Sequence, residues 1–306
     1  MGLTIHYTLT ATRFDTDQSR ASIEAMRQVA LRAGLEFVSE LHHDTDPATD
    51  PVMTWGAMYP GRRIVETGRE MPEREVKPFE PMTDEEIEAA AQEMVESWEE
   101  KNERRELGLD QDEPSAKEQW QAEFMTMTDG AFIDLDPLET IWFFATSKGS
   151  EPFIVGLARY PRVVEHQSQD GPIELETGLG VGWHWEGFCK TQYASMPHDG
   201  GSEDHFVATH RAFCDILRAG EDAGIHVDVH DESKFYEQRD EAELRATVQR
   251  WNRMTAAVAG KIMDSDRDVA SPILGHPEFE HLEAEGEREL ENYGKRMREQ
   301  ADPEDA

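Results

Sequence analysis

Residues 182–194 read GWHWEGFCKTQYA, an aromatic segment in which residue types alternate along the chain. A period of two predicts a β-strand, because successive side chains of a strand point to opposite faces of a sheet. One face of this strand would carry His184, Glu186, Phe188, Lys190 and Gln192. The opposite face would carry Trp183, Trp185, Gly187, Cys189, Thr191 and Tyr193. Since a glycine inside a strand often marks an irregularity, we expect a bulge at Gly187.

The segments after this strand predict a helix and a further strand. A helix over residues 203–222 would place four ring-bearing or apolar side chains on one face: Phe206, His210, Phe213 and Leu217. Residues 225–230 (IHVDVH) then alternate as a strand does. A similar order occurs earlier, with a strand at 3–10, a helix at about 17–33 and a strand at 35–41. The chain therefore contains two units of βαβ size, and both end in His-Asp.

Paired strands are predicted between these units. Residues 140–146 and 152–159 are apolar and flank a turn, which indicates a hairpin, and residues 161–166 and 172–176 form a second pair. The fold class is therefore α+β, with a mixed or antiparallel sheet and its helices mainly on one face. A ferredoxin-like duplication fits this order, and shared strand–helix–strand construction explains it equally well.

The predicted domain organisation is a single α+β domain over residues 1–275. Thr83 and Glu86 form a capping box, which opens an acidic helical insertion over about 83–118. Residues 276–306 are highly charged and predict a C-terminal helix or tail.

The chain is strongly acidic, with 65 Asp and Glu against 30 Lys and Arg and a formal charge of −35 over 306 residues. Such surfaces suit a cytoplasm rich in salt, so we expect a halophilic source, although an ordinary acidic protein would also fit. The charge argues against binding to nucleic acid or to an anionic membrane. The N-terminal segment has no secretory signal pattern, and two cysteines without a CxxC motif fit a reducing, cytoplasmic location.

Acidic residues are scarce in two stretches. Residues 140–160 contain only Glu151, and residues 178–198 contain only Glu186. At this overall acid content, each 21-residue stretch should contain about four or five acidic residues. We therefore expect both stretches to be buried or constrained by a ligand.

One candidate metal site lies in residues 226–232, HVDVHDE. On a strand, His226, Asp228 and His230 would share one face, and two imidazoles beside a carboxylate are ligands for zinc, iron or manganese. A metal-dependent hydrolase would use them with Glu232 or Glu186 as base. The alternative is a polar face exposed to solvent.

A candidate ligand site lies on the aromatic strand, and its predicted members are His184, Lys190, Gln192 and Tyr193. A lysine and a glutamine beside aromatic rings suit an anionic or amide-bearing ligand. If Lys190 is buried, its lowered pKa suits base chemistry, so the catalytic candidates are Glu186, Lys190 and Glu232. The alternative is an ordinary sheet face.

Two further functional hypotheses concern a Cys–His pair and the acidic helix. His210 and Cys214 are four residues apart on the predicted helix and could touch, but a hydrogen-bonded core histidine is the interpretation we favour. The acidic helix at 83–104 could instead serve as the partner surface of a scaffold protein.

We therefore expect a soluble cytoplasmic protein that binds a small ligand or regulates another process. Its pocket would lie near strands 182–194 and 225–232, because eight of the twelve histidines fall between residues 184 and 281 and no known catalytic motif is present. The alternatives are the metal-dependent hydrolase and the scaffold, and the oligomeric state stays open.

Four segments carry a resemblance to a known family: MGLTIHY at the start, GWHWEGFCKTQYAS, DESKFYEQRD and SPILGHPEFEHLEAEG. Together they resemble a family of uncharacterised bacterial proteins. The resemblance implies a soluble cytoplasmic protein with one coherent fold, and it implies no activity, cofactor or catalytic residue.

Overall fold

The computed structural model describes residues 3–45, 61, 63–67, 130–168, 171–197, 200–263 and 271–301. The strands are β1 (Thr4–Ala11), β2 (Phe37–Val38), β3 (His42–Asp44), β4 (Arg63–Glu66), β5 (Phe132–Leu135), β6 (Glu139–Thr146), β7 (Phe153–Arg159), β8 (Val163–Ser168), β9 (Gly171–Glu176), β10 (Trp183–Lys190) and β11 (His226–Asp231). The helices are α1 (Thr16–Arg32), η1 (Gln192–Ser195), α4 (Glu203–Asp222), α5 (Phe235–Gln238), α6 (Glu241–Met263), η3 (Pro272–Gly275) and α7 (Phe279–Ala301).

The described residues divide into two compact units. The first contains a seven-stranded sheet and all the helices above. The second contains most of β4 and β5, which pair with each other, and the β8–β9 hairpin. The predicted acidic insertion at about 83–118 lies outside the described residues, so the single-domain organisation stays a prediction. Residues 276–306, predicted to be a charged helix or tail, include α7.

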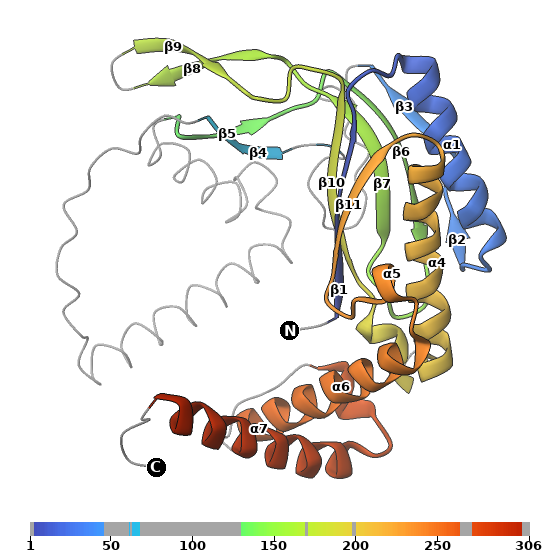
Figure 1. The fold of residues 1–306 in the computed structure, drawn as a ribbon, viewed down its shortest axis with the longest axis vertical. Coiled ribbons are helices and arrows are strands. Elements are labelled where there is room, and N and C mark those ends of the chain that lie inside the picture. The colour runs from blue at the N-terminus through green and yellow to red at the C-terminus, as the bar shows by residue number, and fades with distance from the viewer. Residues whose placement is uncertain are drawn as a thin grey trace, which may run out of the picture. The chain divides into compact units, whose positions relative to one another are not determined.

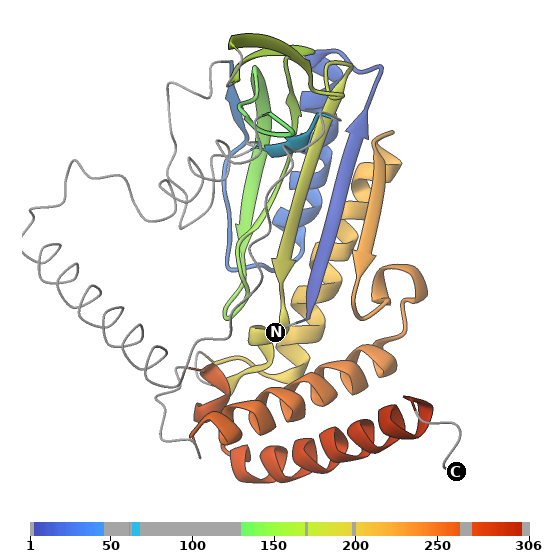
Figure 2. The same cartoon turned by 90° about the vertical axis from the view of Figure 1, so that its left-hand side faces the viewer.

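The seven-stranded sheet has the order β11-β1-β10-β7-β6-β2, with β3 also paired to β6, and its pairs are antiparallel. Strand β1 lies between β10 and β11 (Figure 2). Helices α1 and α4 cover one face (Figure 1). The predicted α+β class, with helices mainly on one face of the sheet, is therefore confirmed.

The predicted unit β10-α4-β11 is present, but β1 is inserted between its two strands. Strand β10 is in turn inserted between β1 and β7, and β2, the strand that follows α1 in the chain, lies at the other end of the sheet. This interleaved order is that of a split βαβ arrangement. The strand expected at 35–41 is limited to Phe37–Val38 and pairs with β6 at the far end of the sheet. A duplication within the chain stays a prediction.

The core between sheet and helices is built on aromatic rings. On β1, Ile5, Tyr7 and Leu9 are buried beneath the helices, as the alternating pattern requires. The Tyr7 ring contacts Phe153 of β7 with centroids 5.2 Å apart, and Phe153 stacks on Phe213 of α4 at 4.7 Å. These contacts join the sheet to α4 around a common aromatic cluster.

The bulge expected at Gly187 is wrong. Strands β1 and β10 pair residue for residue from Thr4↔Lys190 to Ala11↔Trp183, with Tyr7 opposite Gly187. A Cβ added at Gly187 would lie 2.7 Å from ring atoms of Tyr7. The glycine therefore makes room for the neighbouring tyrosine ring instead of interrupting the ladder.

The sheet face opposite α1 and α4 is called the open face. Its side chains on β1, β10 and β11 include His6, His184, Glu186, Phe188, His226, Asp228 and His230. Phe188 is 54% exposed, whereas its neighbours Trp185 and Cys189 face the buried side. The alternation predicted for β10 is therefore confirmed over residues 183–190.

Among the described residues, no helix combines the length and apolar character needed to cross a bilayer.

Candidate functional site

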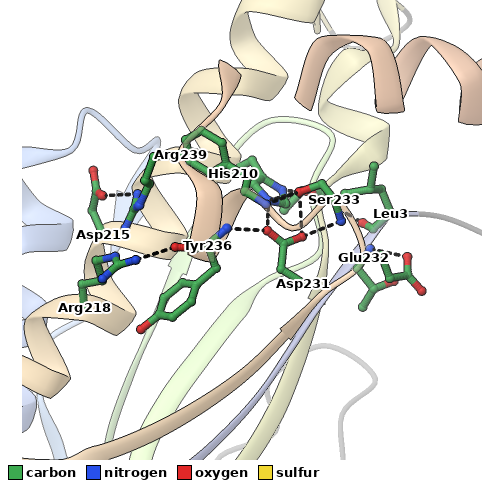
Figure 3. Close-up of polar contacts among 12 residues, drawn as sticks. Leu3, His210, Asp215, Arg218, Asp231, Glu232, Ser233, Tyr236 and Arg239 are labelled. Atoms are coloured by element: carbon green, nitrogen blue, oxygen red, sulfur yellow. Dashed lines mark hydrogen bonds and ion pairs between the residues drawn. The ribbon is translucent and has the colours of Figure 1, made fainter. Parts of the chain in front are cut away.

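The segment after β11 is fixed by Asp231, the buried last residue of that strand. The Ser233 backbone N–H and hydroxyl donate to Asp231 Oδ1 at 2.8 and 2.7 Å. The Tyr236 backbone N–H donates to Oδ2 at 2.9 Å (Figure 3). Both carboxylate oxygens therefore hold backbone groups of the turn that leads into α5.

His210 of α4 completes this network from the helix side. Its Nε2 lies 3.1 Å from Asp231 Oδ2, and its Nδ1 lies 2.8 Å from Thr191 Oγ1. Both members of the His210–Asp231 pair are fully buried. Burial alone would raise the pKa of Asp231, but hydrogen bonds and charge from His210 and hydrogen bonds from Ser233 outweigh it and lower that pKa to about 2. The favoured interpretation of His210, a hydrogen-bonded core histidine, is therefore confirmed.

The backbone on either side of α5 is strained. Lys234 and Arg239 have φ angles of 61° and 55°, a region that residues with a Cβ rarely adopt. Arg239 is held by an ion pair to Asp215 at 2.7 Å, and Arg218 donates to the Tyr236 carbonyl at 2.6 Å. Residues kept in this region need surroundings that impose it, and such residues cluster at binding sites.

A pocket of about 490 Å³ opens beside this strained segment. Its lining residues come from the end of β11, from the turn and helix α5, and from α6: His230, Asp231, Glu232, Lys234, Glu237, Gln238 and Trp251. The lining combines an aromatic ring, an ammonium group and carboxylates. Such a mixture suits a small polar molecule.

Substituting glycine or alanine for Lys234 separates strain from charge, because both changes remove the ammonium group. We expect Lys234→Gly to be more stable to urea than Lys234→Ala by about 1 kcal/mol, because only glycine adopts the φ of 61° without a Cβ penalty. Equal or reversed stabilities would show that the backbone at this position stores no strain.

The predicted ligand residues do not converge on one pocket. His184 Nε2 lies 2.9 Å from the Val181 carbonyl, and the Lys190 ammonium lies 3.7 Å from Glu151. Strand β10 ends at Lys190, so the predicted extension to residue 194 is wrong. Gln192 lies instead in η1, where its amide is buried, accepts from the Leu3 N–H and donates to Asn252. Tyr193 packs against the cluster of Met196, Ala256, Ala259 and Ile273.

Of the predicted catalytic residues, Glu186 and Lys190 lie on the open face of β10, and Glu232 follows the end of β11. Glu186 is paired with Arg63, and the strand register places it opposite Thr8. Lys190 lies opposite Thr4, whose backbone N–H donates to Glu232 at 2.9 Å. Glu232 alone of the three lines the pocket.

The predicted metal ligands His226, Asp228 and His230 do lie on one exposed face of β11. Within the part of the chain that the structure describes, the three-residue group with close potential ligand atoms is a different one, His210, Cys214 and Asp231. Burial raises the pKa of the Cys214 thiol well above its usual value, and both nitrogens of His210 have hydrogen-bond partners. That buried group therefore serves the fold, and a ligand set of His226, Asp228 and His230 stays a prediction.

Ser233, His210 and Asp231 are residue types of a hydrolase triad, but their geometry is not that of one. Ser233 Oγ lies 3.2 Å from His210 Nε2, the same nitrogen that contacts Asp231. A triad needs the serine and the aspartate on opposite nitrogens of the ring. All three side chains are also buried, so they position the turn and do not attack a substrate.

Sequence reasoning missed Lys234 and Trp251 as pocket residues, and it took Asp231 only as part of a polar run. The DESKFYEQRD segment did indicate this turn, since Asp231 and Ser233 are two residues apart, as in turns closed by side-chain hydrogen bonds.

Comparison with known proteins finds no matching family model, no similar curated protein and no similar solved structure. The function of the pocket therefore has to follow from its own geometry and chemistry.

Proposed function

We propose that this protein is a soluble cytoplasmic ligand-binding protein and that its ligand occupies the pocket at the end of β11. One observation carries the proposal: the pocket is bordered by a strained turn that the buried Asp231 carboxylate holds in place through hydrogen bonds. A turn held in advance does not lose conformational freedom when the ligand binds, so more of the contact energy appears as affinity. The charge of −35 supports a salt-rich cytoplasm as its location.

The lining favours a small molecule with charges of both signs. Trp251 offers an aromatic face, which attracts a cationic group, and Glu237 adds a carboxylate. Lys234 offers an ammonium group to an anionic part of the same molecule. A zwitterion of the size of an amino acid or a small peptide would satisfy all three groups.

The test is a thermal-shift screen of the full chain at high salt, followed by calorimetric titration of any compound that stabilises it. The panel contains amino acids, betaines, polyamines and dicarboxylates. We expect zwitterions to bind and Trp251→Ala to weaken binding by about tenfold or more. The control is Phe37→Ala, which removes a half-exposed ring on β2, at the opposite end of the sheet from β11. Binding that survives Trp251→Ala and Lys234→Ala unchanged would refute the pocket.

The metal-dependent hydrolase is less well supported as a function. It requires a base beside the ligands, but Glu186 is paired with Arg63 and Glu232 accepts a backbone hydrogen bond from Thr4. The scaffold hypothesis depends on helix 83–104, which lies outside the described residues, and it stays a prediction.

A further inference from the structure

Two histidines from distant parts of the sequence face each other on the open face. The strand register pairs His6 of β1 directly with His230 of β11. Their ring centroids are 6.2 Å apart, with an angle of 39° between the ring planes. Both residues are exposed, so their nitrogens are accessible from solvent.

This spacing is close to that of two imidazoles on one metal ion. With Zn–N distances of about 2.1 Å and a tetrahedral angle, the two ring centroids would be roughly 5 Å apart. Side-chain rotation of two exposed residues covers the difference of about 1 Å without any movement of the backbone. The strand register has already placed the Cα atoms opposite each other, so little order is lost on binding.

The surroundings favour a cation. Asp228 lies two residues before His230 on β11 and therefore on the same face of the sheet. Glu232 follows the end of β11, and its carboxylate accepts the Thr4 N–H at 2.9 Å. Asp228 pairs with Thr8 and is therefore a diagonal neighbour of His6 across the strand pair. The Asp228 carboxylate could approach the ion, and both carboxylates lower the electrostatic cost of placing positive charge there.

His226 provides an internal comparison. It lies on the same strand and face as His230, but the residue opposite it on β1 is Thr10. His184 on β10 also lies opposite Thr10. Along β11, neighbouring members of the set His226, Asp228 and His230 are two residues apart, which separates them by about 7 Å. That distance is too long for their short side chains to share one ion easily. The cross-strand pair is therefore the better chelator.

We propose that His6 and His230 form a surface site for a divalent transition-metal ion of the Zn²⁺ or Cu²⁺ type. The site is distinct from the set of His226, Asp228 and His230, because its second imidazole comes from β1. Imidazole nitrogens select these ions over Mg²⁺ and Ca²⁺, which prefer oxygen ligands.

The experiment is a calorimetric titration of Zn²⁺ into the chelator-treated full chain, with Mg²⁺ in excess to occupy sites made only of carboxylates. We expect one zinc site, weakened about tenfold or more by His6→Ala and by His230→Ala. The matched control His226→Ala should bind as the unaltered protein does. Equal weakening by His226→Ala, or none by His6→Ala, would overturn the assignment. Urea denaturation of each variant checks that these exposed substitutions leave the fold intact.

A second measurement identifies the metal ligands directly. The electron paramagnetic resonance spectrum of one equivalent of Cu²⁺ should show coupling to two imidazole nitrogens in the unaltered protein and to one in His6→Ala. Unchanged coupling in both single variants would place the ion elsewhere and refute the proposal.

Discussion

Replacing Asp231 with asparagine is expected to lower the free energy of unfolding at pH 7 by about 2–4 kcal/mol, because buried hydrogen-bond donors lose their acceptor, at about 1–3 kcal/mol for each. The asparagine amide cannot replace the Asp231 carboxylate in either of its two orientations. Oδ1 accepts the Ser233 N–H and Oδ2 accepts the Tyr236 N–H, so either placement of the new NH₂ group opposes a backbone donor. The turn beside the pocket should therefore loosen together with the core.

Urea denaturation followed by tryptophan fluorescence measures this loss. The matched control is Asp228→Asn on the same strand, where the side chain is exposed and a change within about 0.5 kcal/mol is expected. Similar effects at the two positions would contradict the role given to Asp231.

The stabilisation that Asp231 provides should depend on pH, and the direction of this dependence follows from its pKa. The pKa of Asp231 is lowered in the folded protein from 3.8 to about 2, so the unfolded chain takes up this proton first as the pH falls. The stabilisation is complete above about pH 4, is lost as the pH falls towards 2, and amounts to about 2 kcal/mol. The difference in stability between the unaltered protein and Asp231→Asn should therefore shrink over this interval.

The second large effect is expected at Gly187, where alanine should destabilise the protein by about 2–3 kcal/mol through overpacking. The new Cβ would lie 2.7 Å from Cζ and Oη of Tyr7. The ring cannot yield freely, because its hydroxyl donates to the Ile154 carbonyl at 2.7 Å and its face contacts Phe153.

A double-mutant cycle with Tyr7→Leu tests this reason for the effect. Leucine lacks the ring atoms that the new methyl group would meet, so Gly187→Ala should cost clearly less in that background. An equal cost in both backgrounds would show that the penalty arises from the backbone of β10 and not from the tyrosine.

The sequence predicted those parts of the fold that depend on local patterns. The alternation of residues 183–190 identified β10 and its buried face, and the apolar stripe of α4 identified His210 as a core residue. The end of β10 was missed because Gln192 is fixed by Leu3, which is 189 positions away in the sequence. A side chain satisfied by so distant a partner leaves no local pattern to read.

The candidate site was predicted only in part for the same physical reason. His230 and Glu232 were identified because they lie in a conspicuous polar run, and both line the pocket. The pairing of His6 with His230 depends on the register between two strands more than 200 residues apart, which periodicity cannot supply. The positive φ of Lys234 has no sequence signal either, since lysine is not a residue that favours it.

The position of β1 has a consequence for the order of events during synthesis. Residues 4–11 leave the ribosome long before their pairing partners, residues 183–190 and 226–231. At about 5–20 residues per second, this strand waits on the order of ten seconds or longer before either neighbour exists. Until then it is an unpaired, apolar edge, and pairing over such long separations also makes folding slow. Nascent chains of this protein should thus depend on chaperones until β11 has been made, and substitutions in β1 should reduce the yield of soluble protein more than their effect on equilibrium stability suggests.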